Sequence, residues 1–320
     1  MVRARRPRDR RRVAVPVVSS GLLSVVVVTY EWPKALDAAL AALADERDDR
    51  VEVIVADDGS GEETRSVVER WRETFGDALR HVRQDDEGWR QSRARNLGAL
   101  EAHGDFLAFL DGDCLVRKGF VAAVRRAALP GWFLAGKRLH LSSALSERVV
   151  DEHVPVWRWS AARWVLRMPR ELVTSHREAA RPGVLLPVRD RRRPWRPSQP
   201  QFSPPYDAYG FFVGVSRSDF EQVNGFDMRY EGWAGEDVDL ALRLRRIGLR
   251  CGWPGPKATL LHLWHSPKKG SMPSNAPFVE ETMQSDRIDA VVGLRELSSE
   301  LAAQESANRV SSSSSSSEPV

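Results

Sequence analysis

The sequence predicts an α/β fold, in which a mixed, mostly parallel sheet is flanked by helices in a single bipartite domain. In the first half of the 320-residue chain, short apolar runs alternate with amphipathic stretches, the pattern of strands joined by crossover helices. Two of the apolar runs end in acidic segments, at residues 57–60 and 111–113. Because parallel strands end at a common edge, these segments should meet where open α/β sheets bind ligands.

The expected elements follow from this alternation. The strands are short and apolar, and they are predicted at residues 23–29, 51–56, 79–83, 106–110, 132–135, 211–216 and 258–263. The helices have one apolar face, and they are predicted at residues 33–44, 62–75, 90–103, 118–128, 144–166 and from about 235 onward. Pro33 suits the first turn of a helix, and the polar turn before residue 62 can cap the next helix.

Basic residues gather in two segments. Residues 1–12 contain seven arginines and one aspartate, and residues 157–196 contain eleven arginines and three acidic residues. Since the whole chain carries a net charge of +4, the remainder carries −10. We expect this acidic remainder to hold the fold and the chemistry. A nucleic-acid-binding protein driven by the basic tail is an alternative, although no aromatic-lined nucleic-acid motif accompanies the arginines.

Composition excludes several other classes of protein. Cys114 and Cys251 are the only cysteines, too few for a disulfide framework, which fits a reducing compartment. No apolar run reaches the roughly 18 residues that span a bilayer, and the arginine-rich start lacks the features of a cleaved signal peptide. We therefore expect a cytoplasmic protein that is not integral to the membrane.

Two acidic motifs could bind a charged ligand. Asp111-Gly112-Asp113 directly follows a buried strand, and two carboxylates at a strand end can hold a divalent cation that clamps a diphosphate. Asp57 and Asp58 end an earlier strand, where a carboxylate can accept hydrogen bonds from a base or ribose. In each case the alternative is a turn in which the aspartates cap the following helix.

A third acidic pair opens a helix in the second half of the chain. Glu236 and Asp237 follow a glycine-containing loop, and the helix dipole there stabilises ionised carboxylates. An ionised carboxylate can remove the proton of a hydroxyl as its oxygen attacks, although an acidic first turn is also a common capping pattern. Trp233 could stack on a sugar face or pack in the core. We expect Asp239 to be a solvated or structural carboxylate.

The motifs together resemble those of the family 2 glycosyltransferases, which have the GT-A fold. Five motifs in order carry the resemblance: residues 25–30, 53–60, 93–98, 106–113, and the Gly225-Phe-Asp227 and 231–237 pair. The last of these is similar to the carboxyl-terminal catalytic half shared by galactosyltransferases and N-acetylgalactosaminyltransferases. The resemblance covers about residues 22–136 and 206–267.

The resemblance implies an inverting, metal-dependent transfer of a sugar, such as Gal, GalNAc or GlcNAc, to a hydroxyl acceptor. The donor is expected to be a nucleotide-diphosphate sugar, most simply a UDP-sugar, and the acceptor a carbohydrate, a lipid-linked molecule or a small molecule. Asp237 would be the base, with Glu236 and Trp233 on the acceptor. The donor-binding residues would be Thr29, Tyr30, Glu31, Asp57, Asp58, Arg93 and Asp111. Arg95 could also neutralise the diphosphate, or it could be a solvated surface residue.

Two histidines complete the expected site. His262 and His265 lie at the end of the last predicted strand, and both can reach one cation through neutral imidazole nitrogens. In the related galactosyltransferases this stretch supplies metal ligands at the same spacing, with methionine at the position aligned with His262. Together with Asp113, the two histidines would form a mixed N/O site for Mn²⁺. Because imidazole is a harder ligand than a thioether, we expect Mg²⁺ to be tolerated.

The resemblance also divides the chain. We expect a disordered arginine-rich tail (1–21), a nucleotide-sugar-binding half (22–136), a basic Trp/Arg-rich insertion (137–205), an acceptor and catalytic half (206–270) and a polar, largely disordered tail (271–320). Tryptophans interleaved with arginines in residues 157–196 could contact an anionic or lipid-linked acceptor, which would make the protein peripheral to the membrane. An arginine-rich lid or an oligomer contact is an equal alternative.

A nucleotidyltransferase that makes the sugar nucleotide is the remaining enzyme alternative. Such enzymes usually carry a glycine-rich amino-terminal loop with arginine and lysine, and residues 29–33 have no such loop.

Overall fold

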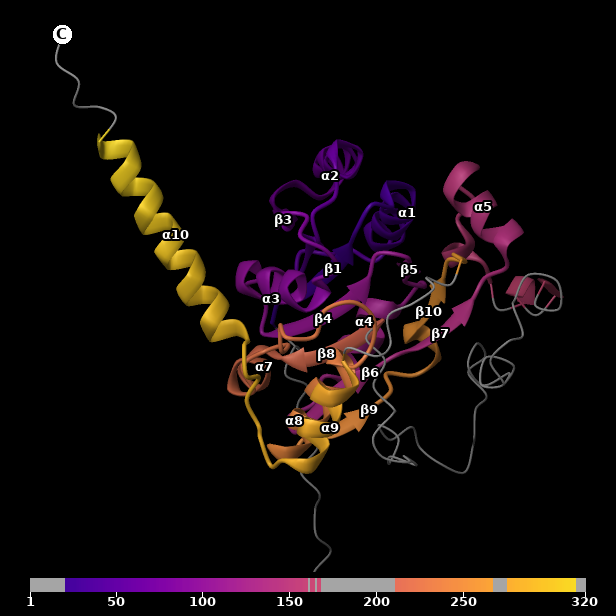
Figure 1. Cartoon of the computed structure of the whole chain (residues 1–320). Helices are drawn as coiled ribbons and strands as arrows, with labels where there is room; N and C mark the ends of the chain where they lie inside the picture. Colours follow the sequence, from indigo (N-terminus) through magenta and orange to yellow (C-terminus); the bar gives the residue numbers. More distant parts are fainter. Residues whose placement is uncertain (1–20, 161, 165, 168–210, 267–274, 315–320) are drawn as a thin grey trace, which may run out of the picture.

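A seven-stranded sheet forms the centre of the computed structural model, which describes residues 21–160, 162–164, 166–167, 211–266 and 275–314. The strands lie in the order β3-β2-β1-β4-β8-β6-β9, and only β8 runs against its neighbours (Figure 1). Their bounds are β1 (Leu23–Thr29), β2 (Val51–Asp57), β3 (Leu79–Arg83), β4 (Phe106–Asp111), β6 (Trp132–Ala135), β8 (Phe212–Ser216) and β9 (Arg250–Gly252). The expected mixed, mostly parallel sheet is confirmed.

A second, three-stranded sheet lies beside the first. It has the order β5-β10-β7, with β5 (Cys114–Leu115), β10 (Thr259–His262) and β7 (Lys137–His140). β10 runs antiparallel to β5 and parallel to β7, so His262 is opposite both Cys114 and His140. The small sheet thus brings the last strand next to the residue that follows Asp113. The sequence predicted β10 but neither of its partners.

Helices cover both faces of the main sheet. Three helices pack their apolar residues against one face of the sheet and form the first core: α1 (Pro33–Ala44), α2 (Glu62–Phe75) and α4 (Phe120–Ala127). Three others pack against the opposite face and form the second core: α3 (Gln91–Glu101), α7 (Arg217–Gln222) and α8 (Glu236–Arg246). In β1, Val25 and Val27 belong to the first core and Val26 and Val28 to the second. Because strand side chains alternate between faces, an apolar run such as β1 must be covered on both sides.

A glycine lets α3 approach the sheet closely. A Cβ atom at Gly98 would collide with the Val26 side chain and lie 3.1 Å from the Ala56 Cβ, so a larger residue would push α3 outward. The close approach places the first turns of α3 beside the carboxyl ends of the central strands.

The described part of the insertion has a shorter helix than the sequence predicted, and its tryptophans are buried. In place of one helix over 144–166, the structure has α5 (Ser143–Asp151) followed by a 3₁₀ turn, η2 (Val156–Arg158). Trp157, Trp159 and Trp164 lie in the core cluster that α1 also joins, and the Trp157 Nε1 donates to Asp45 Oδ2 at 2.8 Å. The expectation that Trp157, Trp159 and Trp164 contact an anionic or lipid-linked acceptor is therefore wrong, because these side chains are buried in the core. Trp195 and the arginines 191–193 lie outside the described residues.

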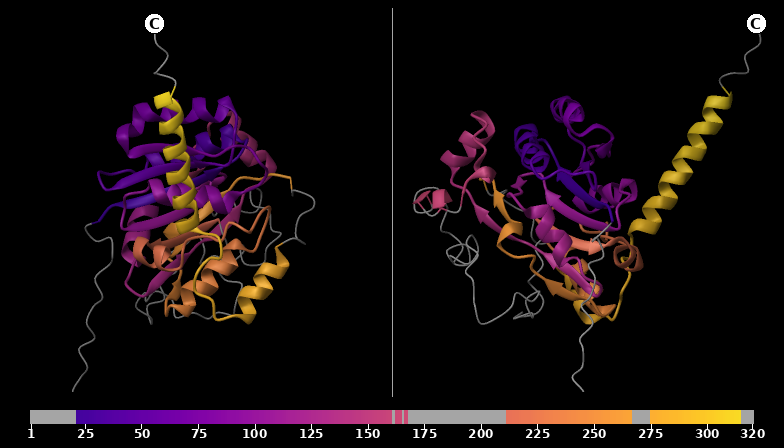
Figure 2. Two further views of the ribbon diagram at one scale, coloured as in Figure 1. Left: turned by 60° about the vertical axis from the view of Figure 1, so that its left-hand side comes forward. Right: turned by 180° about the vertical axis from the view of Figure 1, so that it is seen from behind.

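The sequence predicted a largely disordered tail at residues 271–320, and this is wrong for the described residues 275–314. The structure has α9 (Ala276–Gln284) and α10 (Leu294–Ser314), and Ala290, Leu294 and Leu297 are buried. These few apolar residues anchor a segment whose average composition is polar, which is why composition alone was misleading. Beyond its first turns α10 projects from the body as a long arm (Figures 1 and 2). Residues 1–20 and 315–320 lie outside the described part of the chain.

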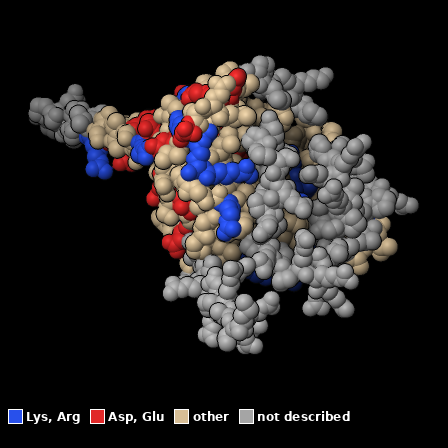
Figure 3. All heavy atoms as spheres, turned by 90° about the horizontal axis from the view of Figure 1, so that it is seen from below, with Lys and Arg blue, Asp and Glu red and all other residues tan. Residues whose placement is uncertain are grey.

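Charge is unevenly distributed on the described surface. Seen from below, acidic side chains are frequent on the side from which α10 projects, and basic side chains gather towards the middle of the face (Figure 3). Among the described residues, none of the helices combines the length and the apolar character needed to cross a membrane.

Candidate active site

The carboxyl ends of β1, β2 and β4 meet at one edge of the main sheet. Thr29 is in register with Asp57, and Val28 with Asp111. The Gly112 N–H donates to the Val28 carbonyl at 2.7 Å, so the turn after β4 stays against β1. A Cβ atom at Gly112 would lie 2.8 Å from that carbonyl oxygen, which explains why glycine separates the two aspartates. The acidic segments that the sequence placed at one edge do lie there.

Asp57 and Asp58 are buried and have different environments. Asp57 Oδ1 accepts from the Ser60 N–H at 2.7 Å, and Oδ2 lies 3.1 Å from His81 Nε2. Burial raises the pKa of Asp57, but the hydrogen bonds from His81 and Ser60 outweigh burial and leave the pKa below its ordinary value. Asp58 accepts from the Arg90 N–H at 2.9 Å and from the Gln84 amide. There burial prevails and raises the pKa of Asp58 to about 6.

Tyr30 and Glu31 form the turn after β1. Tyr30 is 41% exposed, and its hydroxyl donates to Asp86 Oδ2 at 3.2 Å. Glu31 has a φ of +46°, its N–H donates to Ser60 Oγ, and its carboxylate accepts from the Gly61 N–H at 2.6 Å. The Glu31 side chain therefore joins the β1 and β2 turns to each other, in a backbone conformation that is strained for a non-glycine residue.

Arg95 joins two acidic motifs that are far apart in the sequence. Its side chain is 1% exposed, and its guanidinium donates to Asp111 Oδ1 and to Glu236 Oε1, each at 3.0 Å. Burial lowers the pKa of Arg95, but the two carboxylates more than compensate and raise it. The end of β4 and the start of α8 therefore belong to one site.

The other expected arginine points elsewhere. Arg93 donates to Gln84 Oε1 at 3.0 Å and to Glu300 of α10 at 2.8 Å, so it reaches the neighbourhood of Asp58 only through Gln84. The sequence favoured Arg93 over Arg95 as a phosphate ligand, whereas it is Arg95 that lies between Asp111 and Glu236. The missed signal was the i, i+4 spacing of Gln91 and Arg95, which puts both on the same face of α3.

The two carboxylate oxygens of Glu236 differ in their hydrogen bonding. Its side chain is 6% exposed, and Oε1 accepts from Gln91 Nε2 at 2.9 Å as well as from Arg95. Oε2 is buried and has no hydrogen-bond partner within the described ranges. A buried acceptor without a donor is costly unless a ligand supplies one.

Asp237 and Trp233 flank this carboxylate. Asp237 is partly buried, and its Oδ1 accepts from the Val238 N–H at 2.8 Å. Trp233 is 54% exposed in the loop before α8. This loop contains three residues with positive φ, namely Gly232 (+77°), Ala234 (+76°) and Gly235 (+110°). The loop that leads into α8 therefore has a backbone conformation that is uncommon outside glycine, and Ala234 adopts it as well.

Asp113, His262 and His265 converge as the sequence predicted. The Nε2 atoms of His262 and His265 lie 3.3 and 3.4 Å from Asp113 Oδ2, and one ligand atom from each residue lies within 4.8 Å of the others. The His265 Nδ1 is 3.1 Å from the Ser266 carbonyl, which can only accept, so Nδ1 is placed to donate there while Nε2 faces the carboxylate. Burial lowers the pKa of His262 to about 3 and keeps that ring neutral. A carboxylate and two imidazole Nε2 atoms that face one another are a ligand set that fits a divalent cation.

Two neighbours of this cluster were missed. Burial raises the pKa of Asp113, and the nearby charge of Arg138 in β7 opposes that shift, whereas the same charge adds to burial in lowering the pKa of His262. The Arg138 guanidinium lies 4.6 Å from the Phe211 ring centre. The His140 ring is 4.7 Å from that of His262. Both lie in the segment that the sequence assigned to an insertion, and no motif marked them. Cys114 is buried in the core.

Family models match both halves of the chain. Residues 24–140 match the model described as glycosyl transferase family 2, and residues 196–266 match the one described as the N-terminal domain of galactosyltransferase. Solved structures with the same fold include mannosyltransferase PcManGT from Pyrobaculum calidifontis in complex with GDP-Man and Mn²⁺, with a TM-score of 0.51 over 97% of this chain and 83% of that one. S. aureus TarS 1-349 in complex with UDP gives a TM-score of 0.55 over 86% and 68%. Both are 17% identical, which shows the fold alone.

The chain therefore has the GT-A fold of glycosyltransferases. Through residues 24–140, it belongs to glycosyl transferase family 2. Validoxylamine A glucosyltransferase from Streptomyces hygroscopicus subsp. jinggangensis is 31% identical over 71% of this chain and 52% of its own length. Chondroitin synthase from Pasteurella multocida is 25% identical over 72% and 23%. The chain thus spans about half the length of the first of these relatives and less of the second.

Proposed function

We propose that the protein transfers a sugar from a nucleoside-diphosphate donor to a hydroxyl acceptor, with inversion at the anomeric carbon. The observation that supports this most is the pair of hydrogen bonds from Arg95 to Asp111 and Glu236. These bonds join the expected donor motif and the expected acceptor motif in a single site. The names of the relatives, a glucosyltransferase and a chondroitin synthase, support sugar transfer and add glucose to Gal, GalNAc and GlcNAc as candidates.

The donor would lie across the carboxyl ends of β1, β2 and β4. We assign the base and ribose to the region of Asp58, next to Thr29, Tyr30, Glu31 and Asp57, and the diphosphate to the region of Asp111. A UDP-sugar is the first donor to test, with GDP-sugars as the comparison, because the neighbouring structures contain UDP and GDP-Man. Arg93 is assigned a supporting role through Gln84 rather than a direct phosphate contact.

Asp113, His262 and His265 would hold a divalent cation, with Mn²⁺ preferred and Mg²⁺ tolerated. Such a cation neutralises the diphosphate and stabilises the charge that develops on the leaving nucleotide. The Asp113 carboxylate and the two imidazole Nε2 atoms are the ligands that this chain supplies. The positive charge of Arg138, which lies near Asp113 and His262, would add to the positive potential around the donor phosphates.

The acceptor would meet the donor at the start of α8. The Glu236 Oε2 accepts a hydrogen bond from an acceptor hydroxyl, and Trp233 stacks on the acceptor sugar. The Asp237 carboxylate takes the proton of the attacking hydroxyl. The new bond joins the acceptor oxygen to the anomeric carbon, and the bond between that carbon and the phosphate oxygen breaks, which releases the nucleoside diphosphate. Attack opposite the leaving group inverts the configuration.

Metal removal tests the cation assignment. After chelation, we expect transfer to stop, to return with Mn²⁺ and to return in part with Mg²⁺. Asp113→Ala should lower the metal-supported kcat by at least about 10²-fold, a few kcal/mol of transition-state stabilisation. Asp77→Asn, at an exposed carboxylate outside the site, is the matched control. Activity that neither ion restores, or that Asp113→Ala leaves intact, contradicts the assignment.

The raised pKa of Asp58 predicts a pH dependence of donor binding. The ionised carboxylate is the stronger acceptor for an N–H of the base, so we expect the donor to bind this form, and the pKa of Asp58 in the folded protein is about 6. Donor affinity should therefore be constant above this pH and fall by about tenfold per unit below it. Calorimetric titration of the donor between pH 5 and 8 measures this, with Asp58→Asn as the comparison. Since other groups titrate in the same range, the prediction fails if the variant keeps the same pH profile as the wild type.

A further inference from the structure

The segment from Asn275 to Leu294 lies against the loop that carries Glu236 and Asp237. The galactosyltransferase family match ends at residue 266, so this segment lies beyond it. The loop itself has the three positive φ angles of Gly232, Ala234 and Gly235. A loop of this kind keeps its shape only if the surrounding structure holds it.

Asn275 binds both ends of this loop. Its side chain is buried, and its Nδ2 donates one hydrogen bond to the Glu231 carbonyl at 2.8 Å and another to the Ala234 carbonyl at 2.9 Å. A single planar amide therefore sets the separation of two carbonyl groups that lie five and two residues before Glu236. Because the amide has two N–H donors in a fixed geometry, neither aspartate nor alanine can replace it.

Apolar contacts from α9 add to this support. A Cβ atom at Gly235 would lie 2.9 Å from both Val279 Cγ2 and Tyr230 Cε1, so α9 packs closely against Gly235, the last residue of the loop. The Phe278 and Tyr230 rings are 5.6 Å apart in an edge-to-face arrangement. The loop is thus enclosed between α9 and the residues that precede it.

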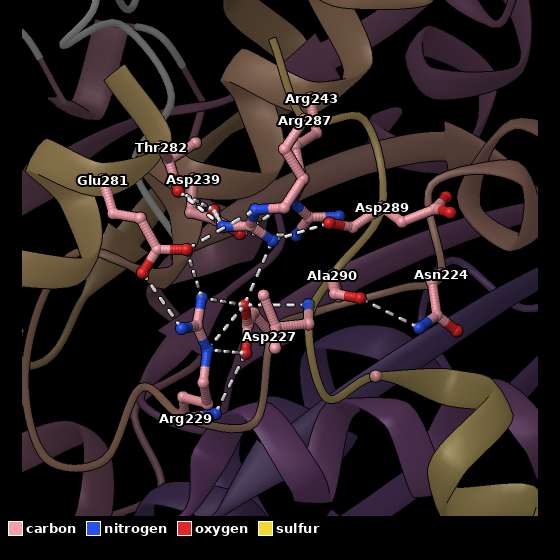
Figure 4. A network of polar contacts seen from close by, with 12 residues as sticks. Asn224, Asp227, Arg229, Asp239, Arg243, Glu281, Thr282, Arg287, Asp289 and Ala290 are labelled. Atoms are coloured by element: carbon pink, nitrogen blue, oxygen red, sulfur yellow. Dashed lines mark hydrogen bonds and ion pairs between the residues drawn. The ribbon is translucent and has the colours of Figure 1, made fainter. Parts of the chain in front are cut away.

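A buried polar network attaches the same segment to α8 (Figure 4). The Thr282 hydroxyl donates to Asp239 Oδ1 at 2.7 Å, and the Arg287 guanidinium donates to Thr282 Oγ1 at 2.8 Å. Asp239 is also bound by Arg243, at 2.8 Å from Nε to Oδ2. Since Asp239 lies two residues after Asp237, Thr282 acts close to the proposed base.

A second carboxylate extends the network to the turn before the loop (Figure 4). The Val291 N–H donates to Asp227 Oδ2 at 3.1 Å, and Arg287 binds the same oxygen at 3.3 Å. Arg229 pairs with Asp227 at 2.9 Å and with Glu281 of α9 at 3.0 Å. Buried charge pairs contribute little net stability compared with apolar packing of the same volume, whereas they do fix geometry.

We propose that Asn275 and Thr282 are positioning residues for sugar transfer. Asn275 sets the path of residues 231–235, and Thr282 sets the orientation of the first turn of α8, so that Glu236 and Asp237 face the donor together. This inference rests on the proposed function. Because a misplacement of about 1 Å can cost 10²-fold in rate, small changes in this support should appear in kcat.

The test compares Asn275→Ala, Asn275→Asp and Thr282→Val with Glu280→Gln, which changes an exposed carboxylate on the same helix. In the folded variants we expect kcat for transfer to fall by about 10- to 100-fold and the Kd for the nucleoside diphosphate to stay within about twofold. A purely structural role would lower Tm and leave kcat per folded molecule unchanged. If kcat of folded Asn275→Ala or Thr282→Val stays within about twofold of the control, the proposal is wrong.

Amide hydrogen exchange provides a readout that does not depend on activity. Amides of residues 232–239 should exchange faster in Asn275→Ala than in Glu280→Gln, whereas amides of β1 and β4 should not change. Unchanged exchange at 232–239 contradicts the positioning role, even if one variant fails to fold and the other is measured alone. If the wild type transfers no sugar from any donor, the proposed function fails, and the exchange experiment still decides whether Asn275 holds the loop.

Discussion

Asp237→Asn is expected to lower kcat for sugar transfer by about 10²- to 10⁴-fold. The amide has the shape of the carboxylate and can keep the hydrogen bond from the Val238 N–H, so the start of α8 should be unchanged. It cannot take a proton from the acceptor hydroxyl near neutral pH. Steady-state kinetics at saturating donor and acceptor measure the effect.

The matched control for this substitution is Glu231→Gln, at an exposed carboxylate of the same loop. Donor affinity should be the same in the wild type and in both variants, since Asp237 acts on the acceptor. A kcat for Asp237→Asn within about fivefold of the control would exclude Asp237 as the base. A large rise in the donor Kd would instead show that the residue serves the donor.

Arg95→Met is expected to lower the free energy of unfolding by about 3–5 kcal/mol and to abolish transfer. Methionine fills much of the arginine volume but leaves the buried Glu236 carboxylate with only Gln91 as a donor among the described residues. Asp111 also loses its guanidinium partner. Arg95→Lys should recover only part of the loss, because one ammonium cannot reproduce the two-sided contact of a guanidinium.

Denaturant unfolding of a double-mutant cycle measures this interaction. The Glu236→Gln substitution removes the unpaired charge, so the double variant Arg95→Met/Glu236→Gln should be more stable than Arg95→Met alone. Transfer should remain absent in both. A loss of less than about 1 kcal/mol in Arg95→Met, or a double variant that is less stable than either single one, would show that Arg95 does not join the two halves.

Much of the fold could be predicted because the strands are apolar and the helices are amphipathic. The predicted bounds of 23–29, 79–83 and 132–135 agree with β1, β3 and β6. Three short strands were missed: β5 and β9 have only two and three residues, and β7 (Lys-Arg-Leu-His) lacks the apolar run that marked β6. Missing β7 matters for the site, since this strand brings Arg138 and His140 beside His262.

Tertiary packing determines which residues are buried and which face the site, and composition alone does not predict this. Leu294 and Leu297 anchor α10 although the surrounding sequence is polar, and the burial of Trp157 depends on α1, which lies more than a hundred residues earlier. The choice between Arg93 and Arg95 likewise depended on which face of α3 meets α8. A sequence motif names the residue types of a site, whereas the contacts between distant elements decide which of them face the same space.

The most direct test of the account is release of nucleoside diphosphate from a panel of UDP- and GDP-sugars, measured with and without Mn²⁺. The wild type, Asp113→Ala and Asp237→Asn are compared under identical conditions. If β4, β10 and α8 form one active site, the wild type turns over at least one donor in a Mn²⁺-dependent manner and both variants lose that turnover. Turnover that is unaffected by both substitutions would contradict the account.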